Sequence, residues 1–265
     1  MGMNALVPYA FDQADITPIW DSLIQRAEAD PEDASALVDL SIILQSRGQT
    51  DQAMQILHNA LQIRNSYCVV HGNGQGVRLL AFVTPGDFMA NTPLDFLLKG
   101  SDTVLWLHYV NAETEDLNDL PQHDVAFMAV GESNDNGLVL ARMKTLLADW
   151  KGPIMNNDPA LIAGLTRDGV SAMLAHEPSI LAPVNYRFQR IQLEAVSRGL
   201  VKFSDLVPGL DFPVIVRPIG THAGNGMERI SDADILADYL SSEPTGELYV
   251  APFIDYRGPD GLFNK

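Results

Sequence analysis

Short apolar runs separated by polar turns constrain the fold of this 265-residue chain more than any other feature of its sequence. Four runs rich in β-branched and aromatic residues, each bounded by Gly, Pro, Asn or Asp, span residues 67–71, 77–83, 103–110 and 125–131, and we expect residues 153–156 to form the last strand of this layer. Amphipathic stretches fall between them at 93–99 and 136–150. Continuous apolar strands that alternate with helices are typical of a mostly parallel sheet covered on both faces. The pattern therefore predicts an α/β layer over residues 67–156.

A helical period precedes this layer, over residues 19–63. Its spacing resembles one whole tetratricopeptide repeat, through Leu37, Leu40, Ser41, Leu44, Gly48, Ala53, Leu57 and Ala60. Small residues let two antiparallel helices approach, leucines fill the space between them, and Gly48 permits the turn. Residues 20–27 predict the second helix of a degenerate preceding repeat. Because three repeats are usually needed for an independent solenoid, we expect a helical cap docked on the next domain, with a peptide-binding array as the alternative.

A second mixture of helices and strands follows the α/β layer. We expect helices at 158–175, 189–198 and 232–240, and strands at 180–187, 213–218, 227–230 and 247–255. Ser231 is the expected N-cap of the helix at 232–240. The predicted domains are a helical region, 1–65, an α/β region, 66–180, and a third region, 181–265.

The charge balance narrows the classes of partner. The 34 acidic side chains outnumber the 17 basic ones, and the formal net charge is −17. Affinity for nucleic acids and anionic membranes comes largely from Lys and Arg, so we expect neither partner. No signal peptide and no apolar run near the length of a membrane helix is visible, so we expect a cytoplasmic protein.

Cysteine and histidine usage argues against a dedicated transition-metal site. Cys68 is the single cysteine, which rules out an internal disulfide, and its place in the apolar run 67–70 predicts core packing. The six histidines include no His-x-x-x-His pair and have no partnering cysteines. We therefore expect no transition-metal ligands in this chain.

A first glycine cluster, at 72–76, lies between two expected strands. A dinucleotide-binding fingerprint would need a helix directly after it, because the pyrophosphate lies on that helix N-terminus. The following residues, 77–83, instead predict a strand. A glycine-rich hairpin turn is the favoured interpretation, and a dinucleotide-dependent oxidoreductase is the alternative.

A second glycine cluster follows an apolar strand that ends in a cation. The strand ends at Arg217-Pro218, and Gly220, Gly224 and Gly226 lie in the loop behind it. Backbone N–H groups of glycines can approach phosphate oxygens closely, and the Arg217 fork matches a phosphate. The cluster predicts an anion-binding loop, with a plain surface hairpin and a solvated Arg217 as the alternative.

These residues resemble the ATP-grasp superfamily, and specifically its glutathione-synthetase-like members. In that pattern a strand ending in Lys-Pro leads into a glycine-rich hairpin over the triphosphate, as Arg217-Pro218 leads toward 224–226 here. The segment 155–159 with Arg167 resembles the turn and helix that carry a nucleotide-contacting Lys, and 248–255 resembles the strand that meets adenine and ribose. The resemblance implies nucleotide contacts for Arg167, Arg217, Gly220, Thr221, His222, Gly224, Gly226, Phe253 and Asp255.

The resemblance also implies a reaction and its cofactors. ATP would phosphorylate a carboxylate substrate with the help of Mg²⁺, and an amine or thiol would capture the acyl phosphate. This chain has Arg where the family usually has Lys, and Asn225 replaces a common loop Lys. The family's magnesium-binding Asp/Glu-x-Asn pattern does not occur in the C-terminal segment that ends at Lys265. We therefore expect a truncated, incomplete ATP-grasp domain behind a Rossmann-like sheet, with the magnesium ligands beyond Lys265.

Two functions remain from this reading. The first is the ATP-binding portion of an ATP-grasp-like carboxylate–amine or carboxylate–thiol ligase, which as this chain would bind nucleotide weakly and turn nothing over. The second is a non-enzymatic interaction protein, in which the tetratricopeptide-like helices bind a protein partner and the α/β region is a degenerate scaffold.

Overall fold

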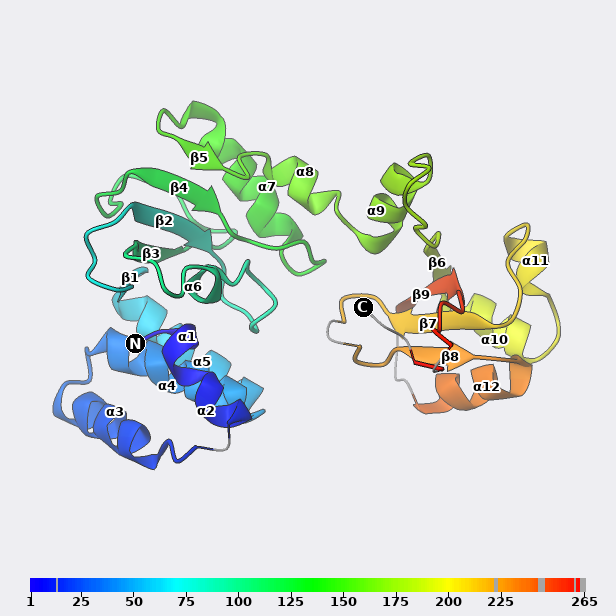
Figure 1. Cartoon of the computed structure of the whole chain (residues 1–265), viewed down its shortest axis with the longest axis horizontal. Coiled ribbons are helices and arrows are strands. Elements are labelled where there is room, and N and C mark those ends of the chain that lie inside the picture. The colour runs from blue at the N-terminus through cyan, green and yellow to red at the C-terminus, as the bar shows by residue number, and fades with distance from the viewer. Residues whose placement is uncertain (13, 222–223, 243–245, 260, 263–265) are drawn as a thin grey trace. The chain divides into compact units, whose positions relative to one another are not determined.

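The computed structural model describes every residue except 13, 222–223, 243–245, 260 and 263–265. The chain forms two compact units, Met1–Ala163 and Gly164–Lys265, and each is described by itself. Figure 1 shows a helical region and a sheet with flanking helices in the first unit, and a second sheet with helices in the other. Every helix of the described residues is too short or too polar to span a bilayer. The division into three domains, with boundaries at 65/66 and 180/181, stays a prediction.

The helical region contains the expected pair of packed helices, and its likeness to a tetratricopeptide repeat stays a prediction. Its helices are α1 (Met3–Leu6), α2 (Pro8–Phe11), α3 (Thr17–Ala29), α4 (Ala34–Ser46) and α5 (Thr50–Ile63). The small residues Ser41, Ala53 and Ala60 are buried, and α4 and α5 pack against each other. Gly48 has a φ of 76°, as the turn between these helices requires. Asp33 begins α4 by accepting a hydrogen bond from the Ala36 N–H. The short helices α1 and α2 were not predicted.

A five-stranded, mostly parallel sheet confirms the predicted α/β layer (Figure 1). Its order is β1-β3-β2-β4-β5, and β1 is antiparallel to β3 while the other neighbours are parallel. The strands are β1 (Ser66–Val70), β2 (Arg78–Val83), β3 (Val104–Tyr109), β4 (Val125–Met128) and β5 (Ile154–Met155). The other elements of this layer are α6 (Leu94–Leu97), α7 (Gly137–Leu146), the 3₁₀ turn Leu147–Asp149 and α8 (Pro159–Ala163).

Strand β2 is apolar from Leu79 to Val83, because both of its faces are covered over these residues. Leu80 and Phe82 pack with Leu140 and Met143 of α7, and the alternate residues of β2 pack with Leu94 of α6. A strand buried on both faces appears in the sequence as a continuous apolar run, and this run predicted the strand.

The glycine cluster at 72–76 is not a hairpin turn, and that prediction was wrong. Strand β3 lies between β1 and β2, so the loop crosses the end of β3 instead of joining paired strands. A Cβ on Gly72, which has a φ of 51°, would lie 2.1 Å from the Asp102 Oδ1. A Cβ on Gly76 would lie 2.7 Å from the Asp102 carbonyl oxygen. The glycines therefore serve close packing, and β2, not a helix, follows them, which removes the structural basis for a dinucleotide fingerprint.

The predicted burial of Cys68 was also wrong, because β1 is an edge strand. Successive side chains of a strand alternate between faces. Tyr67 is buried, whereas Cys68 and Val70 are exposed. An apolar run alone does not reveal that one side of its strand is uncovered.

The second unit contains a four-stranded antiparallel sheet of order β6-β9-β7-β8. Its strands are β6 (Tyr186–Gln189), β7 (Val214–Pro218), β8 (Glu228–Ile230) and β9 (Glu247–Pro252). Its helices are α9 (Arg167–Leu174), α10 (Arg190–Ser197), α11 (Phe203–Leu206) and α12 (Ala233–Ser242). Phe188, Val216 and Val250 of the sheet pack on Leu193 of α10 and Leu236 of α12. This apolar cluster covers one face of the sheet.

Three local predictions in this region need correction. The expected helix at 158–175 is two helices, and Thr166 caps the second by accepting a hydrogen bond from the Gly169 N–H at 3.0 Å. The strand expected at 180–187 begins only at Tyr186. The N-cap of α12 is Asp232 and not Ser231, because the Asp232 carboxylate accepts from the two following helical N–H groups at 3.1 and 3.0 Å.

Substitution of Gly72 by Ala tests the loop packing. Gly72→Ala combines a positive φ with a clash against Asp102, so we expect a loss of about 2–3 kcal/mol in the free energy of unfolding, measured by urea denaturation. Gly48→Ala is the matched control, because Gly48 also has a positive φ but no atom within 4 Å of its added Cβ. We expect a loss of only about 1 kcal/mol there. Equal losses at both positions would contradict the packing role of Gly72.

Candidate functional site

The strand register of the second unit places polar side chains in a row on the sheet face opposite its apolar cluster. Arg187 of β6 lies opposite Tyr249 of β9, which lies opposite Arg217 of β7. Ile215 of β7 precedes Arg217 by two residues, so it points to the same face, and it lies opposite Arg229 of β8. Directly opposed residues point to the same face of a sheet. Three arginines from three strands therefore share this face.

Arg217 is the most buried of these cations, with 7% of its surface exposed. Its Nη2 donates hydrogen bonds to the Thr221 carbonyl oxygen and to the Thr221 Oγ1, the latter at 3.1 Å. The Thr221 hydroxyl donates in turn to the Pro218 carbonyl oxygen at 3.0 Å. The buried Arg217 Nε has no hydrogen-bond partner among the described residues. One donor of a buried guanidinium is thus left for a ligand.

Arg167, the first residue of α9, brings a second positive charge near Arg217. Burial lowers the pKa of the Arg217 guanidinium, and the charge of Arg167 lowers this pKa further. Among the described residues, no carboxylate forms an ion pair with either arginine. Arginine remains protonated in proteins, so two like charges stand together without a counterion. An anion is the ligand that would complement them.

A hydrogen-bonded network beside these cations was missed in the sequence. The Arg187 Nε and Nη2 donate to the two Asp168 carboxylate oxygens at 2.9 and 3.1 Å. The Arg187 Nη2 also donates to the Tyr249 hydroxyl at 2.9 Å, and that hydroxyl donates to Asp168 at 3.0 Å. The Arg187 fork holds the pKa of Asp168 well below its usual value. The network ties α9, which carries Arg167, to the strands β6 and β9 beside Arg217.

The glycine loop has the backbone that its composition predicted. Gly220, Gly224 and Gly226 have φ values of 81°, 82° and 63°, which favour glycine. The Tyr239 hydroxyl of α12 donates to the Gly226 carbonyl oxygen at 2.7 Å and so anchors the end of the loop. His222, the predicted polar group near transferred phosphate, lies outside the described residues. A phosphate contact by this loop stays a prediction.

The two predicted residues behind β9 lie close to a third arginine. The Phe253 N–H donates to the Pro213 carbonyl oxygen at 3.1 Å, and the Arg229 guanidinium lies 4.2 Å from the centre of the Phe253 ring. Asp255 accepts a hydrogen bond from the Arg257 Nε at 2.8 Å, which with the Arg257 backbone N–H lowers the pKa of Asp255 to about 2. A ligand hydroxyl that bonds Asp255 would share the carboxylate with Arg257.

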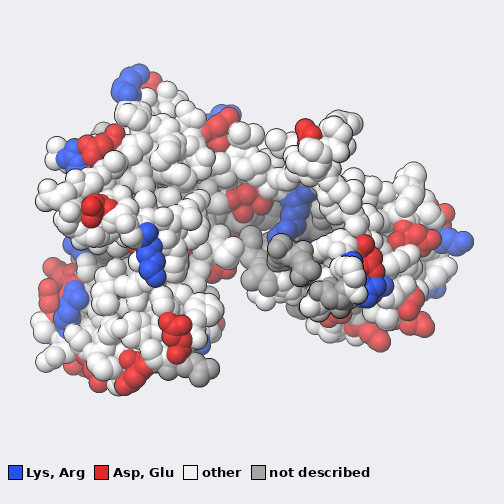
Figure 2. All heavy atoms as spheres, viewed as in Figure 1, with Lys and Arg blue, Asp and Glu red and all other residues white. Residues whose placement is uncertain are grey.

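The described residues contain no group of three or more His, Cys, Asp or Glu that could hold a metal ion. Figure 2 shows acidic side chains spread over the visible face of both units, with basic ones standing more singly. Against a net charge of −17, the arginines on one sheet face are a local exception.

No protein-family model and no curated protein matches this chain. Solved structures do match it, and one of them is described as an ATP-grasp protein, the class that the motifs resemble. They include a RimK domain ATP-grasp protein of Sphaerobacter thermophilus (16% identity, 68% of this chain and 65% of that one, TM-score 0.38). The D-Ala:D-Ser ligase VanG of Enterococcus faecalis matches at 13% identity over 68% of this chain and 64% of that one, with a TM-score of 0.41.

D-alanine-D-alanine ligase of Helicobacter pylori matches at 14% identity over 52% of this chain and 39% of that one, with a TM-score of 0.34. The chain thus spans less than two thirds of the length of each of these three proteins. Because the identities and TM-scores are low, we base the proposed function on the residues of this chain.

Replacement of Asp168 by Asn tests the network through its pH dependence. A carboxylate whose folded pKa is depressed stabilises the fold fully above its unfolded pKa, near 3.8, and loses that contribution as the pH falls through the folded pKa. We expect Asp168→Asn to lower the free energy of unfolding by about 1–2 kcal/mol at pH 7 and equally at pH 5. The difference from the wild type should shrink only below about pH 4. Urea denaturation at several pH values measures it, and a difference that already fades between pH 7 and pH 5 would contradict the assignment.

Proposed function

We propose that the unit Gly164–Lys265 binds the phosphate groups of ATP, and that the chain carries the nucleotide-binding part of an ATP-grasp-like ligase. The observation that supports this most is the buried guanidinium of Arg217, with one unpartnered donor and with Arg167 as an uncompensated neighbour. Burial of a charge without a counterion is costly, and such arrangements concentrate at binding sites. The position of Arg217 at the end of a strand, before a glycine loop, suits a polyphosphate.

The proposed reaction follows from the motif resemblance. A carboxylate oxygen of the substrate attacks the terminal phosphorus of ATP, the bond to the bridging oxygen breaks, and ADP leaves. An amine or thiol then attacks the acyl carbon and releases inorganic phosphate. In this scheme Arg167 and Arg217 bind phosphate oxygens, and the glycine loop excludes water. Mg²⁺ would neutralise phosphate charge when bound with ATP.

The remaining parts of the proposal concern partners and location. The carboxylate substrate, the ribose contact of Asp255 and the cytoplasmic location rest on the sequence argument. Binding of a protein partner by the tetratricopeptide-like helices is the rival function, and the buried contacts between α4 and α5 are equally suited to a helical cap.

Loss of ATP-dependent stabilisation in arginine variants tests the proposal. A ligand at a hundred times its Kd stabilises the folded state by roughly 2.7 kcal/mol, which raises Tm by several degrees. We expect ATP to raise the Tm of the wild type, Arg167→Ala to lose most of the shift, and Arg217→Ala to lose all of it. Because Arg167 is exposed, its variant separates ligand binding from folding.

Arg198→Ala is the matched control, since Arg198 is 70% exposed and belongs to the same unit. It should keep the full ATP shift, and adenosine should give little shift in any variant because it lacks phosphates. A wild-type chain whose Tm does not respond to ATP would refute the proposal and favour the interaction protein.

A further inference from the structure

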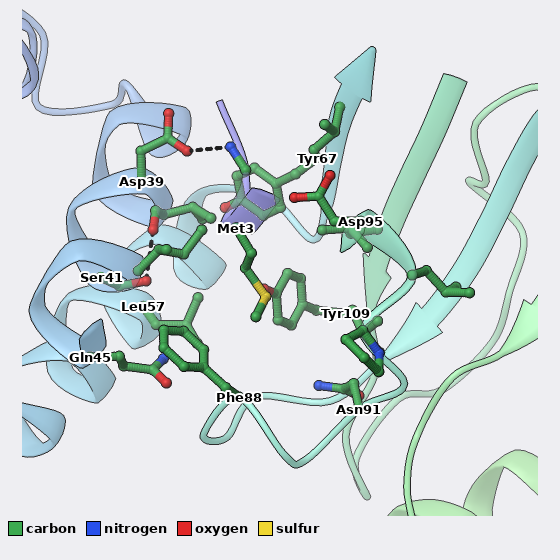
Figure 3. A pocket seen from close by; sticks show the side chains of 18 of the residues that line it. Met3, Asp39, Ser41, Gln45, Leu57, Tyr67, Phe88, Asn91, Asp95 and Tyr109 are labelled. Carbon is green, nitrogen blue, oxygen red and sulfur yellow. Dashed lines mark hydrogen bonds between the residues drawn. The ribbon is translucent and has the colours of Figure 1, made fainter. Parts of the chain in front are cut away.

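A cavity of about 100 Å³ lies within the unit Met1–Ala163 (Figure 3). Its walls come from α4, from the N-terminal segment, from β1 and β3 of the sheet, and from the connection between β2 and α6. This volume equals that of roughly three water molecules of the liquid, or of one compact organic molecule. The cavity is therefore large enough for a small ligand.

Most of the cavity wall is apolar. Its side chains include Met3, Val38, Ile42, Leu57, Phe88 and Leu107. Figure 3 shows Met3 and Phe88 between the helices on one side and the strands on the other, with Leu57 on the helical side. A charged ligand would lose its hydration in these surroundings without enough partners to replace it. The wall therefore favours a neutral molecule with an apolar body.

Asp95 of α6 is one polar group in the wall with hydrogen-bonding capacity left. Its side chain is 5% exposed, and its Oδ2 accepts a hydrogen bond from the Asn4 N–H at 2.7 Å. Its Oδ1 has no hydrogen bond among the described residues. The His71 Nε2 lies 3.2 Å from this Oδ1 but is not aligned to donate to it. Asp95 can therefore accept from a ligand.

The Tyr109 hydroxyl is the second such group. Burial raises the pKa of Tyr109 well above its ordinary value, and the neighbouring Tyr67 raises this pKa further. The hydroxyl therefore stays neutral and remains a donor at physiological pH. It has no hydrogen bond among the described residues, and Figure 3 shows the ring of Tyr109 beside Met3 at the centre of the cavity.

Two other polar groups in the wall, the Asp39 and Asn91 side chains, are already bonded. The Asp39 carboxylate accepts from the N-terminal ammonium at 2.7 Å and from the Gly2 N–H at 3.1 Å. The Asn91 side chain exchanges two hydrogen bonds of 2.8 Å with the Thr84 backbone. Asp95 offers one acceptor and Tyr109 one donor within a mostly apolar wall.

We propose that this cavity binds a small neutral molecule with a branched or ring-shaped apolar body and one hydroxyl or carboxamide group. Such a group accepts a hydrogen bond from the Tyr109 hydroxyl and donates one to the Asp95 Oδ1. The site is independent of the arginine face in the other unit and does not depend on ATP binding. The proposed ligase function assigns no role to the helical region. In this proposal the helical region forms one wall of a binding site.

Titration of the full chain with isobutyramide tests the inference, followed by the NMR signals of methionine methyl groups. We expect a saturable shift of the Met3 methyl signal, because Met3 lines the cavity. Met143, which is buried beyond the cavity wall, and Met227, in the other unit, serve as internal controls and should not shift. Isobutyrate and isobutylammonium, which have a similar shape but carry a charge, should bind at least about tenfold more weakly.

Two variants link the binding to the named groups. Tyr109→Phe removes only the hydroxyl and should weaken isobutyramide binding about fivefold or more, whereas Tyr186→Phe in the other unit should not change it. Val38→Leu adds a methylene to the wall and should also weaken binding. No saturable shift of Met3, or binding that Tyr109→Phe leaves unchanged, overturns the proposal. Tighter binding of isobutylammonium than of isobutyramide would overturn the assignment of a neutral ligand.

Discussion

The register of three antiparallel strands determines what the Gly164–Lys265 unit can bind. Because β9 lies between β6 and β7, Tyr249 is flanked by Arg187 on one side and Arg217 on the other. A shift of one residue in either pairing would turn an arginine into the apolar cluster on the opposite face. The burial of Phe188, Val216 and Val250 therefore also fixes the position of the cations. The packing of the apolar core and the position of the candidate anion site therefore depend on the same strand register.

The three cations of this face and Arg167 are not equivalent, because their neighbours differ. Asp168 neutralises Arg187, and the Phe253 ring covers Arg229. Arg167 and Arg217 lack such a carboxylate among the described residues. The Asp168 carboxylate fixes the position of α9 against β6 through Arg187. It does not pair with Arg167 or Arg217, so their positive charge stays available where an anion would bind. Charge balance thus separates arginines that hold the fold from arginines that are available to a ligand.

The sequence predicted what depends on local pattern and missed what depends on pairing. Apolar runs located the strands, and Arg217 with its glycine loop could be proposed as a site because these residues are neighbours along the chain. The loop at 72–76 was misread because local turn composition does not tell whether flanking strands pair with each other. Asp168 and Tyr249 are separated by 81 residues, so no local motif announces their contact. Cys68 was misplaced for a related reason, since the uncovered side of an edge strand is a property of the sheet.

The arginine at position 217, where the related motif usually has lysine, changes how a phosphate site and its loop are connected. A guanidinium presents several donors in fixed directions, so its Nη2 can hold Thr221 while its Nε stays available. A lysine ammonium is a compact charge on a flexible stem and does not fix the direction of a second donor. Thr221 lies in the glycine loop and also bonds the Pro218 carbonyl oxygen. An anion that bonds the Arg217 Nε would therefore be tied through one rigid group to the conformation of the loop above it.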